Sequence, residues 1–186
     1  MRSQWADRWV CAGLVVGVLG LGACAPVRVS SHVDTRSDFS RFKTFDWGPA
    51  DALPAGDARL DANGFFKDHM LGAVERQMVL KGYEHAGEST MPDVRIHFHA
   101  VIRVRMNVGA LDVRRGFCSG AGCGAGVNEF EEGTLIVDVI DARTNQLVWR
   151  GWAQDSVGNT LENQDKLAKR IDQSVKGLMA ALPGRR

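Results

Sequence analysis

The sequence predicts an α+β domain in which an antiparallel β-sheet of about four to five strands carries two helices on one face. Some segments place an apolar residue at every second position, which is typical of strands buried on one side. Other segments place one every three to four positions, which is typical of amphipathic helices. The two kinds of segment do not alternate strictly along the chain, and this favours α+β over repeated βαβ units.

The first half of the chain predicts two strands and a helix. The run 27–33 is β-like, and the alternating aromatic segment 43–47 predicts a second strand. A helix is expected over 63–81, followed by Gly82, because the residue after a helix end often adopts the left-handed conformation that glycine favours. The apolar residues of this helix recur at helical spacing: Phe66, Met70, Ala73, Val74 and Met78.

The second half predicts three strands and a helix. The clearest alternation covers 94–106, which we expect to form a long strand buried on one side. Strands over 134–140 and 147–157 are joined by the polar segment 141–146, which is typical of a hairpin connection. An apolar stripe over 163–182 predicts a C-terminal amphipathic helix.

Composition limits the class of protein. The chain has 186 residues, of which 45% are hydrophobic and 24% charged, with a formal net charge of +1. These values exclude intrinsic disorder, a fibrous protein and a polytopic membrane protein, and the length fits one domain. Because the charge is balanced, nucleic acid is not expected as a partner.

The amino-terminal residues 1–23 read as an export signal. Arg2 and Arg8 precede an apolar run that is too short to span a bilayer. The run ends in Leu21-Gly22-Ala23-Cys24, which resembles the lipobox of bacterial lipoproteins. That resemblance implies acylation of Cys24, cleavage before it, and a mature chain over 24–186 that is anchored to the membrane without crossing it. An ordinary secretory signal with an incidental cysteine is the alternative.

The residue after Cys24 bears on localisation. Ala25, in place of aspartate, resembles the sorting signal that directs enterobacterial lipoproteins to the outer membrane. We therefore expect an outer-membrane lipoprotein whose domain faces the periplasm. Loss of Arg2, Asp7 and Arg8 with the leader leaves a formal net charge of zero, so the folded body has little electrostatic attraction to anionic lipid.

Residues 109–133 form a glycine-rich insertion that contains Cys118 and Cys123. In an oxidising periplasm these two cysteines are expected to form a disulfide bond. Reduced thiols, or a metal or redox role, remain alternatives. The insertion lacks the Gly-Lys-Ser/Thr sequence of a phosphate-binding loop, so a hairpin tip is the simpler interpretation.

His97 and His99 are expected on one face of a strand, in the spacing of a two-histidine metal pair. Neighbouring arginines oppose a cation, so we expect instead a solvated outer sheet face with cross-strand pairs to Asp138 or Asp155. If Arg150 and Trp152 face the same way, with Leu147, Trp149 and Ala153 pointing inward, this face is a candidate partner surface. Its members are Arg95, His97, His99, Arg103, Arg105, Arg150 and Trp152.

Motifs for enzyme chemistry are missing from the sequence. It has no Gly-x-Ser-x-Gly elbow, no His-Glu-x-x-His and no dinucleotide fingerprint after a strand. We therefore expect a protein that is not an enzyme, with no catalytic residues, no cofactor and no dedicated metal site.

Several segments together resemble one family over nearly the whole mature chain. They are Asp38 to Trp47, Lys81-Gly82-Tyr83, Pro92-Asp93, Gly133 to Ala142 and Leu147 to Gly151. In order and spacing they are similar to the bacterial lipoprotein family known as domain of unknown function 4136. The resemblance implies a lipidated envelope protein with a small α+β domain and no agreed activity. The glycine-rich insertion departs from the family pattern.

The sequence therefore favours a membrane-anchored envelope lipoprotein that acts as a non-enzymatic binding or assembly module in the periplasm. Its expected partners are the membrane, through the lipid anchor, and an envelope protein. The alternative is a small-ligand or metal-binding periplasmic protein that uses the His97/His99 face or the cysteine loop.

Overall fold

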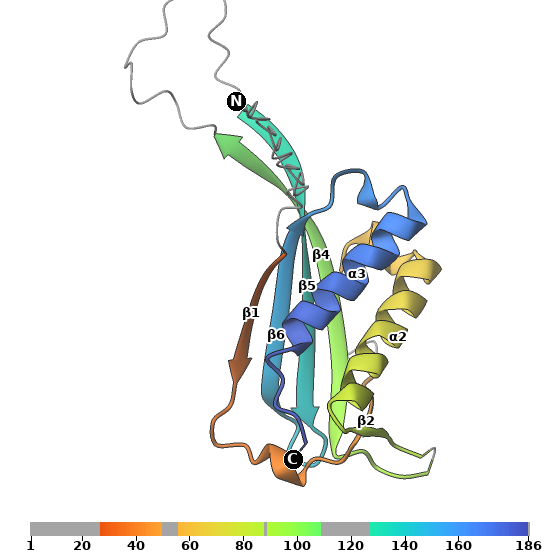
Figure 1. Ribbon diagram of the computed structural model, residues 1–186, viewed down its shortest axis with the longest axis vertical. Coiled ribbons are helices and arrows are strands. Elements are labelled where there is room, and N and C mark those ends of the chain that lie inside the picture. Colours follow the sequence, from red (N-terminus) through yellow and green to blue (C-terminus); the bar gives the residue numbers. More distant parts are fainter. Residues whose placement is uncertain (1–26, 50–55, 88, 109–126, 186) are drawn as a thin grey trace, which may run out of the picture.

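A single β-sheet with helices on one of its faces forms the body of the protein (Figure 1). The computed structural model describes residues 27–49, 56–87, 89–108 and 127–185. The strands are β1 (Arg28–Val33), β2 (Thr44–Trp47), β3 (Glu84–His85), β4 (Val94–Val108), β5 (Val127–Asp141) and β6 (Gln146–Ser156). The helices are α1 (Ala58–Asp61), α2 (Gly64–Leu80) and α3 (Gln164–Met179), with short 3-10 turns η1 (Phe39–Arg41) and η3 (Gly158–Thr160).

The strand order is β1-β6-β5-β4-β2-β3. The α+β class and the two main helices are confirmed, but the sheet has six strands and is mixed. Strand β2 pairs parallel to both β4 and β3, whereas β1, β6, β5 and β4 pair antiparallel. The parallel pairs arise because α2 returns the chain to the end of the sheet where β2 began, as a crossover helix does. The two-residue β3 is too short to produce a periodic pattern.

Both main helices begin and end close to the predicted residues. Asn63 caps α2 by accepting a hydrogen bond from the Phe66 amide at 3.0 Å, and Asn163 caps α3 through the Lys166 amide at 2.9 Å. Gly82 follows α2 with φ +89°, which confirms the predicted glycine stop. These capping signals come from residues within one turn of the helix end, so they can be recognised in the sequence.

The β5–β6 hairpin has the predicted connection but an unpredicted bulge. The Asp141 carboxylate accepts hydrogen bonds from the Arg143 and Thr144 amides at 2.9 and 3.1 Å. The register then shifts between Val139 and Ile140, which pair with Trp149 and Leu147. The prediction that Leu147 points inward is therefore wrong: Leu147 is 39% exposed, and Val148, the extra residue of the bulge, is buried in its place.

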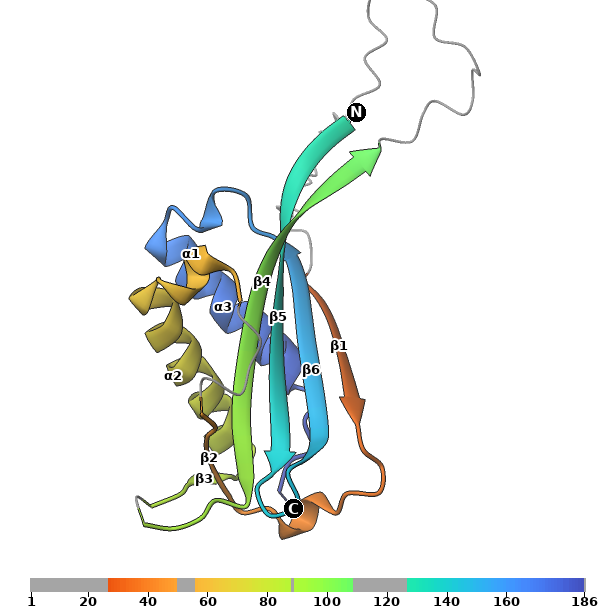
Figure 2. The same ribbon diagram turned by 180° about the vertical axis from the view of Figure 1, so that it is seen from behind.

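The core lies between the helices and the sheet. In Figures 1 and 2, α2 and α3 cover one face, and the described residues place no helix over the other. Trp149 and Ala153 point into this core as predicted. A Cβ on Gly151 would overlap the six-membered ring of Trp149, so glycine is required where the indole lies flat on the sheet. The largest fully buried side chains include Trp149, Phe45, Met70, Met78, Ile96 and Leu178.

Asp93 joins β2 to β4 in the parallel part of the sheet. One carboxylate oxygen accepts hydrogen bonds from the amides of Lys43 and Thr44 at 2.8 and 3.0 Å, and from the Thr44 hydroxyl at 3.2 Å. Burial acts to raise the pKa of Asp93, but the hydrogen bonds from Thr44 and Lys43 outweigh it and hold the pKa below its usual 3.8. The charged form is therefore the one that holds the two strands together.

Replacing Asp93 by asparagine tests this role. We expect Asp93→Asn to lower the free energy of unfolding near neutral pH by about 1–2 kcal/mol, since a neutral amide oxygen is a weaker acceptor. Because the folded pKa is lowered, the stabilisation is present above the unfolded value of 3.8 and is lost as the pH falls through the folded value. Urea unfolding followed by tryptophan fluorescence should show the difference shrinking below 3.8. A difference that is constant with pH would contradict this assignment.

Candidate functional site

The face of the sheet opposite the helices carries the side chains predicted as a partner surface. Directly opposite residues of adjacent strands project to the same face. The register places His97, Asp138 and Arg150 in one row across β4, β5 and β6, and His99, Ile136 and Trp152 in the next. We call this the helix-free face, and Figure 2 shows the side of the sheet away from the helices. By strand alternation it includes Arg95, His97, His99, Arg103, Arg105, Arg150 and Trp152.

A bidentate ion pair between Arg150 and Asp138 lies on the helix-free face. The guanidinium donates from Nε to Oδ1 and from Nη2 to Oδ2, both at 2.6 Å. The side chain of Asp138 is 9% exposed and that of Arg150 is 45% exposed. Hydrogen bonding to Asp138 raises the pKa of Arg150 above its usual value. The predicted cross-strand pairing at Asp138 is present, and it uses both carboxylate oxygens.

His97 differs from the solvated side chain that the sequence predicted. It is 6% exposed and lies against Gly48, where an added Cβ would overlap Nε2 of its ring. Burial lowers the pKa of His97, Asp138 acts to raise it and Arg95 acts to lower it, and the net shift is downward. His97 is therefore mainly neutral near pH 7. The close approach of the backbone at Gly48 contributes to this burial, and the alternation within β4 does not reveal it.

The two histidines do not assemble a metal site in the described part of the chain. Asp138 lies opposite His97, but Arg150 occupies both of its oxygens. His85 lies in β3, and its ring centroid is 5.1 Å from that of Phe45. No group of three His, Cys, Asp or Glu side chains among the described residues is placed to hold a metal ion.

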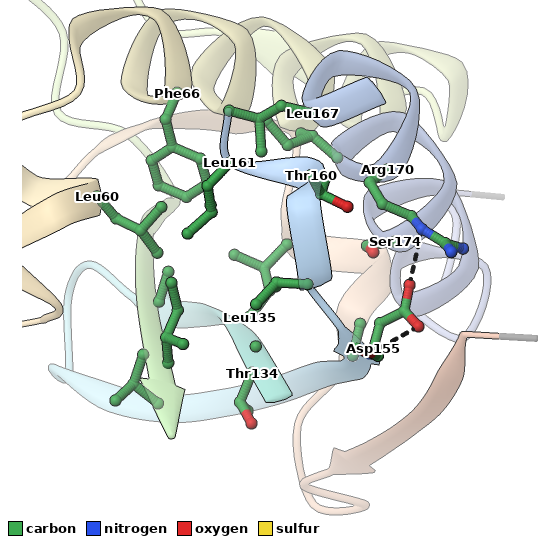
Figure 3. Close-up of a pocket in the computed structure, with 18 residues that line it drawn as sticks. Leu60, Phe66, Thr134, Leu135, Asp155, Thr160, Leu161, Leu167, Arg170 and Ser174 are labelled. Atoms are coloured by element: carbon green, nitrogen blue, oxygen red, sulfur yellow. Dashed lines mark hydrogen bonds and ion pairs between the residues drawn. The ribbon is translucent and has the colours of Figure 1, made fainter. Parts of the chain in front are cut away.

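The other predicted partner, Asp155, belongs to the opposite face. Its carboxylate forms an ion pair with Nε of Arg170 in α3 at 2.9 Å, on the helix side of the sheet (Figure 3). The prediction of a pair on the outer face is therefore wrong for Asp155. Asp155 lies two residues after the inward-pointing Ala153 in β6, so strand alternation places both on the same face. This relation could be recognised in the sequence.

A half-buried apolar strip occupies the middle of the helix-free face. Ile136 lies between His99 and Trp152 in one row, and Val101 lies in the adjacent row. All four side chains are partly exposed, and the described residues place no helix over them. Ile136 and Val101 were not among the predicted site residues, although their strand parity matches that of the residues that were.

Arg103 and Arg105 lie at a separate point of the same face. Arg105 donates from Nε to Glu132 at 3.0 Å, and Arg28 of β1 contacts the other oxygen of the same carboxylate. Glu132 is 5% exposed, whereas Arg103 beside it is exposed. The seven residues therefore form two groups, one around Arg150 and Trp152 and one around Glu132. Cys24, Cys118 and Cys123 lie outside the described residues.

A cavity between the helices and the sheet has a volume of about 80 Å³. Its apolar lining includes Leu60, Phe66 and Leu135, and the Arg170–Asp155 pair lies at its edge (Figure 3). An apolar cavity needs roughly 150 Å³ to accept a molecule the size of benzene. The space therefore suits a packing gap better than a ligand site.

A larger hollow of about 560 Å³ opens beside His97 and Trp47. Its lining includes Pro49 and Gly56, which flank the segment 50–55 outside the described residues. Separately, no helix among the described residues is both long and apolar enough to cross a membrane.

The class of protein is thus a small α+β domain with one sheet, helices on one face and an ion-paired, partly apolar opposite face. The model of the family described as domain of unknown function (DUF4136) matches residues 29–184. The chain therefore belongs to this family, as the sequence resemblance predicted. Comparison with curated proteins gives no match.

Among solved structures, a PDZ domain protein from Parabacteroides distasonis is similar with TM-score 0.49 and 14% identity, over 84% of this chain and 36% of that chain. A single-substitution variant of the PelC dodecamer from Paraburkholderia phytofirmans has TM-score 0.49 and 8% identity, over 86% of this chain and 99% of that one. A second PelC dodecamer structure has TM-score 0.43 and 8% identity. Likenesses this distant carry no argument about function.

The Arg150–Asp138 pair can be tested by removing the arginine. Arg150→Ala leaves a buried carboxylate without its partner, and we expect it to lower the free energy of unfolding by about 2 kcal/mol, below the 3–5 kcal/mol of a fully buried pair because Arg150 is half exposed. Combining it with Asp138→Asn should restore part of the loss, since no buried charge then remains.

Arg143→Ala, in the exposed β5–β6 turn, is the matched control and should change the free energy of unfolding by less than about 0.5 kcal/mol. Urea denaturation of the four proteins measures all these values. Equal instability of the single variant and the double variant would show that Asp138 does not depend on Arg150.

Proposed function

We propose that this chain is a membrane-anchored envelope lipoprotein whose domain is a non-enzymatic binding or assembly module. In this proposal Cys24 carries the lipid anchor, the domain faces the periplasm from the outer membrane, and the helix-free face binds an envelope protein. Membership of the DUF4136 family supports this class without assigning an activity.

The observation that carries the binding role is the half-buried apolar strip. Trp152, Ile136 and Val101 lie on a face to which the described residues contribute no covering helix. Aromatic and arginine side chains are enriched where proteins bind one another, and Arg150 lies beside Trp152 at such a position. Because Asp138 fixes the Arg150 guanidinium, this part of the surface is ordered before a partner arrives, which reduces the entropy lost on binding.

The polar groups of the helix-free face support binding more than catalysis. Both oxygens of Asp138 are held by Arg150, and Glu132 is shared by Arg28 and Arg105. Carboxylates held in this way are poorly placed to exchange protons with a substrate. His97 is buried against Gly48.

The anchor is tested by changing the acylated residue. Cys24→Ala should move the protein from the membrane fraction to the soluble fraction or leave it as an uncleaved precursor, because the acylated thiol is lost. Intact-mass measurement of the wild-type protein should show a chain that begins at Cys24 and carries the mass of two or three acyl chains. A product without acyl mass, or one that begins upstream of Cys24, would refute the anchor.

The binding surface is tested by crosslinking in intact cells. A photoreactive amino acid at Ile136 should give one discrete protein adduct, whereas the same group at Val79, a 60% exposed position of α2, should not. Trp152→Ala should lower the yield of the Ile136 adduct about thirtyfold, the effect of a hot-spot residue worth about 2 kcal/mol.

A thermal melt of the Trp152→Ala protein controls for loss of folding. Equal adduct yields from Ile136 and Val79, or an Ile136 adduct that is insensitive to Trp152→Ala, would place the partner elsewhere.

A further inference from the structure

Strands β4 and β5 continue beyond the rest of the sheet. The last pair between β5 and β6 is Glu132–Ser156, whereas β4 and β5 stay paired as far as Val108 and Val127. Residues 104–108 and 127–131 therefore form a two-stranded extension, which we call the ribbon. Figures 1 and 2 show the ribbon leaving the body at the end of the sheet where β1 begins.

The ribbon exposes apolar side chains. Val104 and Met106 are 62% and 65% exposed, and Phe130 is 37% exposed. The register places Val104 and Met106 on one face of the ribbon and Phe130, opposite Arg105, on the other. Apolar groups on both faces suit an apolar medium that surrounds the ribbon better than a partner that docks on one side.

The start of β1 is fixed at the base of the ribbon. Arg28, the first residue of β1, contacts the carboxylate of Glu132, which also accepts a hydrogen bond from Arg105 at 3.0 Å. Cys24 lies four residues before Arg28, a span of at most about 14 Å. The part of β5 beyond Glu132, Val127 to Glu131, extends about 16 Å. A lipid on Cys24 would therefore keep the base of the ribbon close to the membrane surface. Its distance from the surface would be no greater than about the length of the ribbon.

The charges of the ribbon do not oppose contact with lipid. Arg28 and Arg105 share the carboxylate of Glu132, which leaves one positive charge at the base of the ribbon, and Glu131 accepts a hydrogen bond from Arg59 at 2.8 Å. Among the described residues, Glu129 in the ribbon and Arg103 at its base have no ion-pair partner, and their opposite charges cancel. Long charged side chains at a membrane surface can keep the charge in water while their stems lie against lipid.

We propose that the ribbon is a second membrane contact, in which Val104, Met106 and Phe130 enter the lipid surface beside the acylated amino terminus. This inference rests on the proposed acylation of Cys24. The ribbon would orient the domain on a membrane that the anchor alone leaves free to rotate.

Two exposed methionines make a test possible without substitution. Met106 is in the ribbon and is 65% exposed, and Met91 lies just before β4, at the opposite end of the sheet, and is 61% exposed. About 40 Å of strand separates these two ends. The acylated full-length product, with photoreactive methionine in place of methionine, is reconstituted in phosphatidylethanolamine–phosphatidylglycerol vesicles and irradiated. Mass spectrometry then reads the adducts on each methionine.

Lipid adducts on Met106 should exceed those on Met91 by about tenfold, a ratio equivalent to 1.4 kcal/mol of preferential burial. Replacing Val104 and Phe130 by serine keeps the reporter and should lower the Met106 lipid adduct by a similar factor, because two apolar contacts are lost. Val79→Ser, an equally exposed apolar position on α2, should leave it unchanged.

The outcomes distinguish the two proposals. Acylated protein on vesicles with equal lipid adducts at Met106 and Met91, or with Met106 joined to a second copy of the chain, overturns the ribbon contact and leaves the anchor standing. Protein that carries no acyl mass at Cys24 overturns the proposed anchor, and the ribbon contact with it.

Discussion

The antiparallel pairing of β4 with β5 is the constraint on which the rest of the structure depends. It runs without a bulge from Val94–Asp141 to Val108–Val127 and lies in the middle of the sheet. Because side chains alternate along each strand, this single register decides which residues enter the core and which reach the helix-free face. A slip by one residue would bury His97 and His99 under the helices and expose Ile96. The same pairing, continued past the ends of its neighbours, produces the ribbon.

The segments that carry the family resemblance stabilise the fold. Asp93 holds the amides of Lys43 and Thr44, so it sets the position of β2 beside β4. The side chains on either side of Gly82 secure the C-terminal segment: Lys81 donates to the Leu182 carbonyl at 2.6 Å and Tyr83 to the Pro183 carbonyl at 2.8 Å. Burial raises the pKa of Tyr83 to about 12, so this hydroxyl remains a donor across the physiological range. These motifs therefore explain the fold and do not identify an activity, which is why function has to be argued from the surfaces.

Periodic and local features were predictable from the sequence, and long-range ones were not. The alternation in β4, the helical spacing in α2 and the turn chemistry at Gly82 each depend on residues close in the chain. Two unpredicted features, the parallel pairing of β2 and the contact of His97 with Gly48, depend on residues that are far apart in the chain. A third, the bulge at Val148, depends on one extra residue in a strand. In the candidate site, strand alternation correctly placed Arg150 and Trp152 on the same face of the sheet. It could not show that Arg150 would hold both oxygens of Asp138.

The helix-free face and the ribbon, the two proposed contact surfaces, can be used by the domain at the same time. The ribbon lies at the end of the sheet where β1 begins, and the β5–β6 turn lies at the other end (Figures 1 and 2). A membrane at the ribbon end leaves the row of His99, Ile136 and Trp152 on the side of the domain, at a distance from the lipid set by the strands. An anchor at a single point limits the distance of the domain from the membrane but does not fix which face is turned toward it. A second contact at the ribbon removes that freedom, and it would hold the helix-free face toward proteins that share the same membrane surface.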